Sequence, residues 1–331
     1  MRNAGAHKSL SRSASGPRMN AFQRLCILTC AAIFGLIVLG GVVRATDSGL
    51  GCPDWPLCHG NVIPTGDKHT IIEWSHRTTA SVVGFLMLGI IVLAFRQYRR
   101  VPAVLYPSIA AGALLIAQAG LGGAAVLNEL PPEIIMVHLG MALTILTLLI
   151  VITLTSFSMT RQFRPMAVHP GLARVALAAS AATLVLMLVG SYVAGAHYGL
   201  ACNGWPLCNG DLVPGEGGAS VQVHFLHRFL AVVVGVTLVA LLWLAWQARW
   251  TSPPAFTLAG AAFAVFLLQA LLGAANVWTE LADEVAAAHL ATATLLWLIL
   301  ALLNIRLWRL HERLPRTVSQ SPRPNLAGVT R

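Results

Sequence analysis

Eight long windows without a charged residue constrain this chain more than any other feature of its sequence. A helix needs about 20 apolar residues to cross a hydrocarbon core about 30 Å thick, and each window comes close to that length or exceeds it. Continuous apolarity is not the alternating pattern of outer-membrane barrel strands. The sequence therefore predicts an all-α integral membrane protein whose eight transmembrane helices cover residues 25–43, 78–95, 101–128, 134–160, 175–196, 229–248, 250–279 and 285–305.

The overall composition agrees with this class and excludes an ordinary soluble domain. Of the 331 residues, 56% are hydrophobic and 10% are charged, whereas soluble domains carry about 25% charged residues. The few charges are therefore most informative through their positions.

The basic residues are placed asymmetrically. Eighteen of the 22 lie in the terminal segments or the even-numbered connections, and the other four are Arg44, Lys68, Arg77 and Arg228. Lys and Arg near helix ends are retained on the cytoplasmic side, so both termini are predicted to be cytoplasmic. The net charge of +10 is then a topology signal, and no nucleic-acid partner is expected.

The N-terminal segment leaves two interpretations of the membrane. Its first twenty residues are rich in Arg and Ser and lack acids, which also fits a mitochondrial transit peptide. The stretch is short and has no apolar face, so a cytoplasmic tail and a bacterial inner membrane are predicted. A mitochondrial inner membrane is the alternative.

The chain repeats itself at an offset of 150 to 151 residues. The segment Cys52-Pro-Asp-Trp-Pro-Leu-Cys58 matches Cys202-Asn-Gly-Trp-Pro-Leu-Cys208, and the later matches are Gln118 with Gln269, Gly122 with Gly273, Glu129 with Glu280, Glu133 with Glu284, and His138 with His289. Each half has four helices, an even number, so the repeat is parallel and its axis lies along the membrane normal. The prediction is two tandem four-helix bundles related by a pseudo-two-fold axis.

The repeat also sets the expected domain boundaries. The four-helix halves are predicted over residues 22–160 and 175–308, and the cytoplasmic segments over 1–21, 161–174 and 309–331.

Four histidines are predicted inside the helices at a common depth. His76, His138, His227 and His289 each lie a turn or two from the outer end of a helix, roughly 5–10 Å deep at 1.5 Å per residue. Two imidazoles at matched depth on facing helices can bind a metal macrocycle from both faces, and bundle cores hold such cofactors. We therefore predict axial haem ligation by His76 with His138 and by His227 with His289.

Two alternatives to haem ligation stay open. An intramembrane histidine can serve as a hydrogen-bonded helix contact. Zinc or copper is disfavoured because neither pair has an obvious third ligand, although Glu73 with His76 could hold a carboxylate-bridged metal.

Arg77 and Arg228 directly follow a histidine in each half. Guanidinium groups suit bidentate carboxylate recognition, so both are predicted to hold haem propionates. The alternative is an arginine that extends to the membrane interface.

Each half has a Cys-x5-Cys loop on the outer side, where disulfides persist. The prediction is two disulfides, Cys52–Cys58 and Cys202–Cys208, and a metal site would need further ligands. Cys26 and Cys30 in the first helix are interpreted as buried small residues.

The halves differ where chemistry is expected. Glu73 faces His224 across the repeat, and Asp47 faces His197. A carboxylate one turn from an axial ligand can donate or accept protons or stabilise a cation, although a carboxylate near a helix start is also favoured by the helix dipole. We predict that the first half is the reacting site and the second an electron-transfer site.

These motifs together resemble the haem A synthase family. The resemblance covers residues 22–310 and rests on the two cysteine loops, the Glu-x-x-His-Arg segment that ends at Arg77, the His-Arg pair that ends at Arg228, and the single histidines at positions 138 and 289.

The resemblance implies an enzyme that oxidises a methyl group of haem O to the formyl group of haem A, for insertion into cytochrome oxidase. It implies that His76 and His138 hold the substrate haem, that His227 and His289 hold a permanent haem b, and that Glu73 is the critical carboxylate. It also implies oxygen derived from water and disulfide loops involved in haem transfer or redox exchange. The implied partners are haem O synthase, the cytochrome oxidase assembly machinery and membrane lipid.

Other functions remain open at this stage. A di-haem b-type cytochrome would pass electrons from quinol to an outer acceptor, with Glu73 as a proton relay, and a haem transporter is a third interpretation. The contrast between Glu73 and His224 argues against a symmetric carrier. The sequence leaves the oligomeric state open, a homo-oligomer included.

Overall fold

The computed structural model describes residues 19–160, 170–215 and 217–312. In these residues the chain forms eight α-helices and one short 3-10 helix, η1 (Ser48–Leu50). The α-helices are α1 (Ala21–Ala45), α2 (Lys68–Gln97), α3 (Pro102–Leu127), α4 (Pro132–Thr160), α5 (Pro170–Gly195), α6 (Gly218–Gln247), α7 (Pro253–Trp278) and α8 (Asp283–Glu312).

Each of the eight α-helices is long and apolar enough to cross a membrane. The predicted multi-pass helical architecture is therefore confirmed for the described part of the chain. The windows 78–95 and 229–248 were too short at their N-terminal ends, because the first turns of α2 and α6 carry charged and polar residues. The helical residues that precede the two windows include Glu73, His76 and His227.

The helix ends follow from local chemistry. Asn20 caps α1, accepting a hydrogen bond from the backbone N–H of Gln23 at 2.8 Å, and Asp67 caps α2 through the N–H of Thr70 at 3.0 Å. Both caps satisfy backbone donors that have no partner within the helix. Proline occupies the first position of α3 and α7, where its missing N–H costs nothing.

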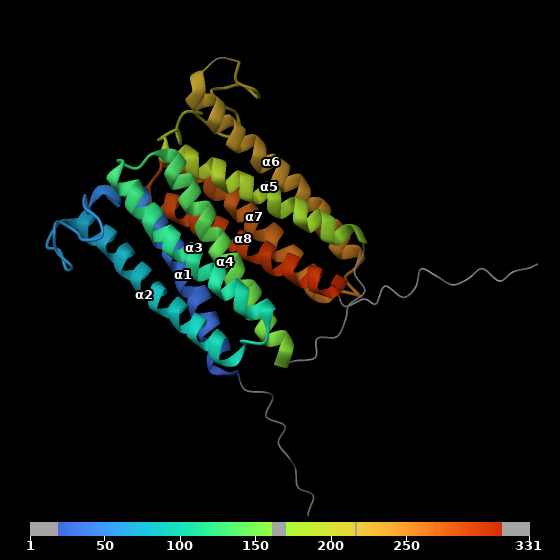
Figure 1. Cartoon of the computed structure of the whole chain (residues 1–331). Coiled ribbons are helices and arrows are strands. Elements are labelled where there is room, and N and C mark those ends of the chain that lie inside the picture. The colour runs from blue at the N-terminus through green and yellow to red at the C-terminus, as the bar shows by residue number, and fades with distance from the viewer. Residues whose placement is uncertain (1–18, 161–169, 216, 313–331) are drawn as a thin grey trace, which may run out of the picture.

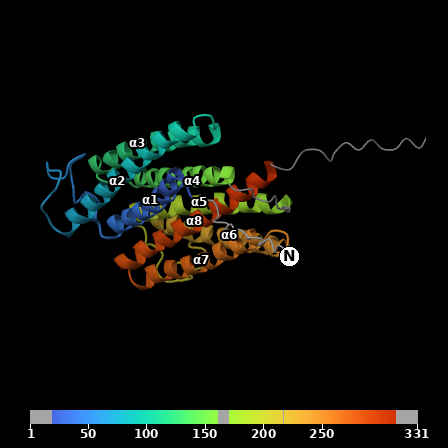
Figure 2. The same ribbon diagram turned by 90° about the horizontal axis from the view of Figure 1, so that it is seen from below.

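The α-helices run roughly side by side (Figure 1). In the first four, α1 packs on α2, α2 on α3, α3 on α4 and α4 on α1, and α5 to α8 repeat this ring. The rings meet through α1 with α8, α4 with α5 and α4 with α8. In Figure 2 the α2–α3 pair and the α6–α7 pair accordingly lie on opposite sides of the other four helices.

Two large apolar clusters fill the two rings. One is built mainly from α1 to α4 and contains Phe22, Met87 and Leu146, whereas the other comes from α5 to α8 and contains Leu172 and Leu241. The hydrophobic core is therefore divided in the same way as the helix contacts.

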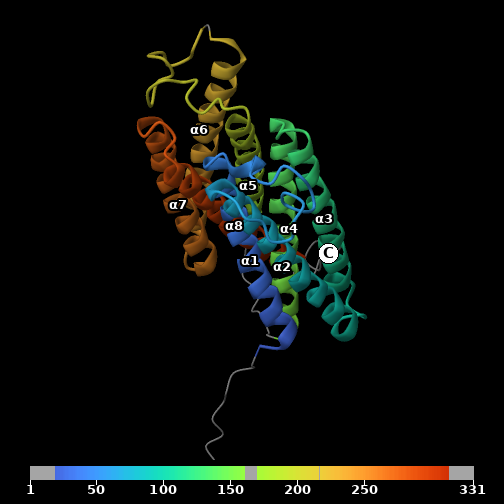
Figure 3. The ribbon, with the colours of Figure 1, turned by 90° about the vertical axis from the view of Figure 1, so that its left-hand side faces the viewer.

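Both cysteine-containing loops lie at the same end of the helices, opposite the start of α1 (Figure 3). We call residues 46–67 loop 1 and residues 196–215 loop 2. The predictions for the tail 1–21, the linker 161–174 and the tail 309–331 fall wholly or partly outside the described residues, as do most of the basic residues behind the predicted orientation.

Candidate functional site

The four predicted histidines lie on diagonal helices of the two rings. His76 on α2 lies within electrostatic range of His138 on α4, and His289 on α8 lies within that range of His227 on α6. The structure thus brings together the two pairs that the sequence suggested.

All four histidine residues are half-buried, but in three of them the Nδ1 atom is fully buried. The Nδ1 atoms of His138, His227 and His289 are buried without a hydrogen-bond partner. The carbonyls of Leu186 and Gln269 lie beside His227 and His289, but neither contact reaches hydrogen-bond geometry. Unsatisfied buried polar atoms are uncommon in native proteins and call for an explanation.

Glu73 lies one turn before His76 and is 5% exposed. Its Oε1 accepts a hydrogen bond from Arg77 Nε at 2.8 Å, which forms an ion pair. Because Arg77 holds Oε1, the second oxygen, Oε2, carries the acceptor capacity that remains. Among the described residues no group of three or more His, Cys, Asp or Glu side chains could hold a metal ion, so the carboxylate-bridged metal gains no support.

The guanidinium of Arg77 also ties α2 to loop 1. Its Nη1 donates to the carbonyls of Asp54 at 2.6 Å and Leu57 at 2.7 Å, and its Nη2 donates to the carbonyl of Cys52 at 2.7 Å. One side chain therefore connects the carboxylate of Glu73 with the backbone of the disulfide loop.

Arg228 makes the corresponding contacts in the second ring. Its Nη1 donates to the carbonyls of Gly204 and Leu207, and its Nη2 to that of Cys202, each at 2.9 Å. Its Nε lies 3.2 Å from Nε2 of His224, in place of a carboxylate. The backbone N–H of Cys202 also points at Nδ1 of His224. A neutral imidazole accepts a hydrogen bond at only one of its two nitrogens. His224 can therefore accept from Arg228 or from Cys202, but not from both at once.

These bonds limit the predicted propionate role of the two arginines. A guanidinium has five N–H donors, and four of those of Arg77 are in the bonds above. One N–H on Nη2 remains for a propionate. Sequence reasoning missed the loop carbonyls, because a backbone acceptor leaves no signal in residue identity.

Both predicted disulfides, Cys52–Cys58 and Cys202–Cys208, are present. Loop 1 is further ordered by the carboxylate of Asp54, which accepts hydrogen bonds from the N–H groups of His59 at 2.6 Å and Gly60 at 2.8 Å. These bonds, that from Gly60 foremost, hold the pKa of Asp54 below its usual range. Cys26 is buried and Cys30 partly buried, in agreement with their interpretation as packing residues.

Tryptophans hold the other side of each loop against a helix. A Cβ atom on Gly123 of α3 would lie 2.8 Å from Cδ2 of Trp55, so the indole rests on that glycine. In loop 2, Trp205 meets Trp278 of α7 edge to face, with ring centroids 5.8 Å apart. Each loop is thus attached to two helices of its own ring, loop 1 to α2 and α3 and loop 2 to α6 and α7.

Arg44 connects the two rings at this end, a role that the sequence did not indicate. It donates to Asp47 Oδ1 at 2.7 Å and to the carbonyl of Ala194 on α5 at 2.6 Å, and its Nη2 lies 3.0 Å from Nε2 of His197. Asp47 and His197, noted in the sequence as a difference between the halves, are therefore joined through one arginine.

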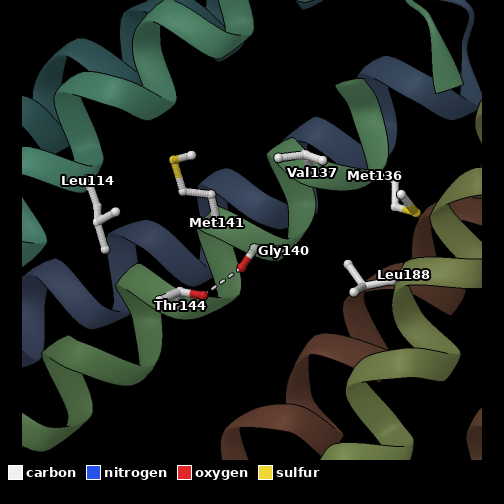
Figure 4. Close-up of a pocket in the computed structure, with 7 residues that line it drawn as sticks. All are labelled: Leu114, Met136, Val137, Gly140, Met141, Thr144 and Leu188. Carbon is white, nitrogen blue, oxygen red and sulfur yellow. Dashed lines mark hydrogen bonds between the residues drawn. The ribbon is translucent and has the colours of Figure 1, made fainter. Parts of the chain in front are cut away.

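An apolar groove of about 370 Å³ is lined by residues of α3, α4 and α5. Met136 and Met141 of α4 line it together with Leu114 of α3 and Leu188 of α5 (Figure 4). The α4 residues that line the groove flank His138 in the sequence, but none of the predicted site residues lines it.

The fold and the site define a multi-pass helical membrane protein with two disulfide-closed loops at one end of its helices and one of the four predicted histidines on each of α2, α4, α6 and α8. The chain belongs to the cytochrome oxidase assembly protein family, whose model matches residues 23–301.

Curated relatives agree with this membership. A haem A synthase of Symbiobacterium thermophilum is 31% identical over 278 residues, which cover 80% of this chain and 90% of the relative. A haem A synthase of Alkalihalophilus pseudofirmus is 29% identical over 294 residues, covering 86% and 96%. A third, from Shouchella clausii, is 30% identical over 224 residues, covering 66% and 74%.

Proposed function

We propose that this chain is a haem A synthase, which oxidises a methyl group of haem O to the formyl group of haem A. Similarity to relatives of that name over most of the chain supports the activity. The observation that carries the proposal is a buried carboxylate, Glu73, one turn from His76 in the first ring. The second ring has His224 at the equivalent position and no such carboxylate there.

In the first ring, His76 and His138 would hold the substrate haem between α2 and α4. Oxidation of a methyl group releases protons, which need an acceptor near the reacting carbon. Glu73 is suited to this role because Arg77 fixes Oε1 at 2.8 Å and leaves Oε2 to take up a proton. Loop 1, held by Arg77 and Trp55, would limit the access of bulk water from the outer side.

In the second ring, His227 and His289 would hold a permanent haem b. The backbone carbonyls of Leu186 and Gln269 lie beside these two rings, which fits this group, since an imidazole whose Nδ1 is on the side of a backbone carbonyl can present Nε2 to a metal. A haem b supplies one-electron redox chemistry when bound. His224 replaces Glu73 here, so the ring lacks the proton acceptor of the first.

The remaining parts of the proposal concern architecture and cellular context. The two rings, residues 22–160 and 175–308, would be domains related by a pseudo-two-fold axis along the membrane normal. The matching contacts of Arg77 and Arg228 support this relation. Both termini would be cytoplasmic in a bacterial inner membrane. The partners would be haem O synthase and the cytochrome oxidase assembly machinery, and Arg77 and Arg228 would each offer one N–H to a propionate.

The test is a pigment analysis of the full-length chain, expressed in cells that make haem O and lack another haem A synthase. Haem A extracted together with haem B supports the proposal. Haem B alone at two per chain would instead identify a di-haem cytochrome and refute it.

Glu73→Gln tests the assignment of the carboxylate, with His224→Gln as the matched control at the equivalent position. Loss of a general acid–base group costs about 10²-fold or more, so Glu73→Gln should lower haem A formation by that factor and keep haem B. The control should keep both. Wild-type haem A formation by Glu73→Gln would refute the role of Glu73 while leaving the activity to the pigment analysis.

A further inference from the structure

Each of the four histidine rings rests on a glycine of the preceding helix. A Cβ atom built on the glycine would meet the ring at short distance in every case. The pairs are Gly40 with His76 Nε2 at 3.3 Å, Gly122 with His138 Cε1 at 3.2 Å, Gly190 with His227 Cε1 at 2.7 Å, and Gly273 with His289 Cε1 at 3.2 Å.

Backbone conformation does not explain these glycines. All four lie inside helices, and none has a positive φ. Glycine is unfavourable in a helix interior relative to alanine, so the space that it leaves is the physical reason for its presence here. Not every helical glycine has a close neighbour, since a Cβ on Gly120 or Gly260 would meet nothing within 4 Å, whereas a Cβ on Gly41 or Gly112 would meet an aliphatic side chain instead of a histidine ring.

The contact also sets which edge of the ring faces the helix. In three pairs the edge with Cε1 and Nδ1 lies on the glycine, and Nδ1 is buried there without a partner. For His227 and His289 the adjacent carbonyl belongs to the residue one turn before the glycine, Leu186 or Gln269. A ring held this way keeps Nδ1 nearer the neighbouring helix than Nε2: a Cβ on Gly190 would lie 3.1 Å from Nδ1 and 3.6 Å from Nε2 of His227.

His76 presents the opposite edge, with Nε2 and Cδ2 toward Gly40 at 3.3 and 3.7 Å. A rotation of 180° about the Cβ–Cγ bond exchanges the two edges and occupies the same volume. The cradle at Gly40 therefore accommodates the orientation seen in the other three rings.

We propose that Gly40, Gly122, Gly190 and Gly273 are positioning residues that seat the histidine rings against the preceding helix and direct Nε2 toward an axial haem position. The proposal rests on the haem ligation in the proposed function. It adds that the missing Cβ, rather than helix flexibility, is what each glycine contributes. Gly190 has the shortest contact, so it is the most sensitive of the four.

The first test is a double-mutant cycle in haem-free protein, which needs no ligand. Gly190→Ala should lower the unfolding temperature when His227 is present, and should no longer do so in the His227→Ala background. Gly260→Ala, a helical glycine with open space, should not lower it in either background. Independent effects of Gly190→Ala and His227→Ala would overturn the proposed contact.

The second test measures haem b retained per chain and the low-spin spectrum of bis-histidine iron. Gly190→Ala should retain haem at least tenfold less than wild type, with loss of the low-spin signal, whereas Gly260→Ala should match wild type. If Gly190→Ala and Gly260→Ala retain the same amount of haem b, the positioning role of Gly190 is overturned, whereas the proposed function is not affected. A wild-type protein that takes up no haem refutes the proposed function, and the cycle then still decides the contact between Gly190 and His227.

Discussion

Arg77→Lys is the perturbation that most directly tests how loop 1 is held. Lysine keeps the positive charge beside Glu73 but replaces the guanidinium fork by a single ammonium. Arg77 donates to three loop carbonyls, those of Cys52, Asp54 and Leu57. An ammonium that stays near Glu73 can reach one of them, so about two of the three bonds are lost.

The structure sets the size of the effect. Hydrogen bonds from charged donors contribute about 1.5–3 kcal/mol each, and the Arg77 side chain is only 15% exposed. Two lost bonds, discounted for non-additivity, weaken the attachment of loop 1 by about 2–4 kcal/mol. Since 1.4 kcal/mol is a factor of ten, the open population of loop 1 should rise roughly 30- to 700-fold.

Hydrogen–deuterium exchange of the full-length protein measures this opening. The N–H groups of Cys58, His59 and Gly60 are bonded within loop 1, and they should exchange faster in Arg77→Lys. Arg228→Lys is the matched control and should accelerate exchange in loop 2 alone. Unchanged exchange over residues 52–61 in Arg77→Lys, or an equal increase there in Arg228→Lys, would refute the reasoning.

Two further predictions concern loop 1. Cys52→Ser opens a disulfide between residues separated by six positions, which removes about 2 kcal/mol in the chain-entropy model. Limited proteolysis should then cut loop 1 sooner than in Cys26→Ser, and equal cleavage would contradict the prediction. Folding lowers the pKa of Asp54 from its ordinary value of 3.8. Its contribution to the stability of loop 1 is therefore fully present above pH 3.8 and is lost as the pH falls through the folded pKa. Exchange in loop 1 should therefore accelerate below about pH 4. In loop 2 the backbone N–H of Asn203 donates to the neutral amide of Asn209, so exchange in loop 2 should not accelerate at low pH. An equal acceleration of exchange in both loops would exclude Asp54 as the cause.

The number of helices and the disulfides were predictable from the sequence because both depend on local information. Apolar runs record the thickness of a membrane within one segment of chain. The cysteines of each pair are six positions apart, so no distant segment decides their pairing. The helix starts were less predictable, because Arg77 and Arg228 set the beginnings of two uncharged windows, whereas α2 begins at Lys68 and α6 at Gly218.

The pairing of the histidines was predictable for a different reason. An internal repeat gives two copies of one pattern, and even-numbered helices of a four-helix half share a direction. That predicted His76 with His138 and His227 with His289 at matched depths, and in the structure the two members of each pair lie within electrostatic range of each other.

The sequence by itself thus determined a polytopic helical protein with two disulfide loops and two histidine pairs, since periodicity and spacing encode these features locally. The tertiary structure alone decided that Arg77 and Arg228 bind loop carbonyls, that Arg44 joins the two rings, and that four glycines receive the histidine rings. An arginine selects acceptors, and a glycine leaves space, only in relation to segments that packing brings beside it from elsewhere in the chain.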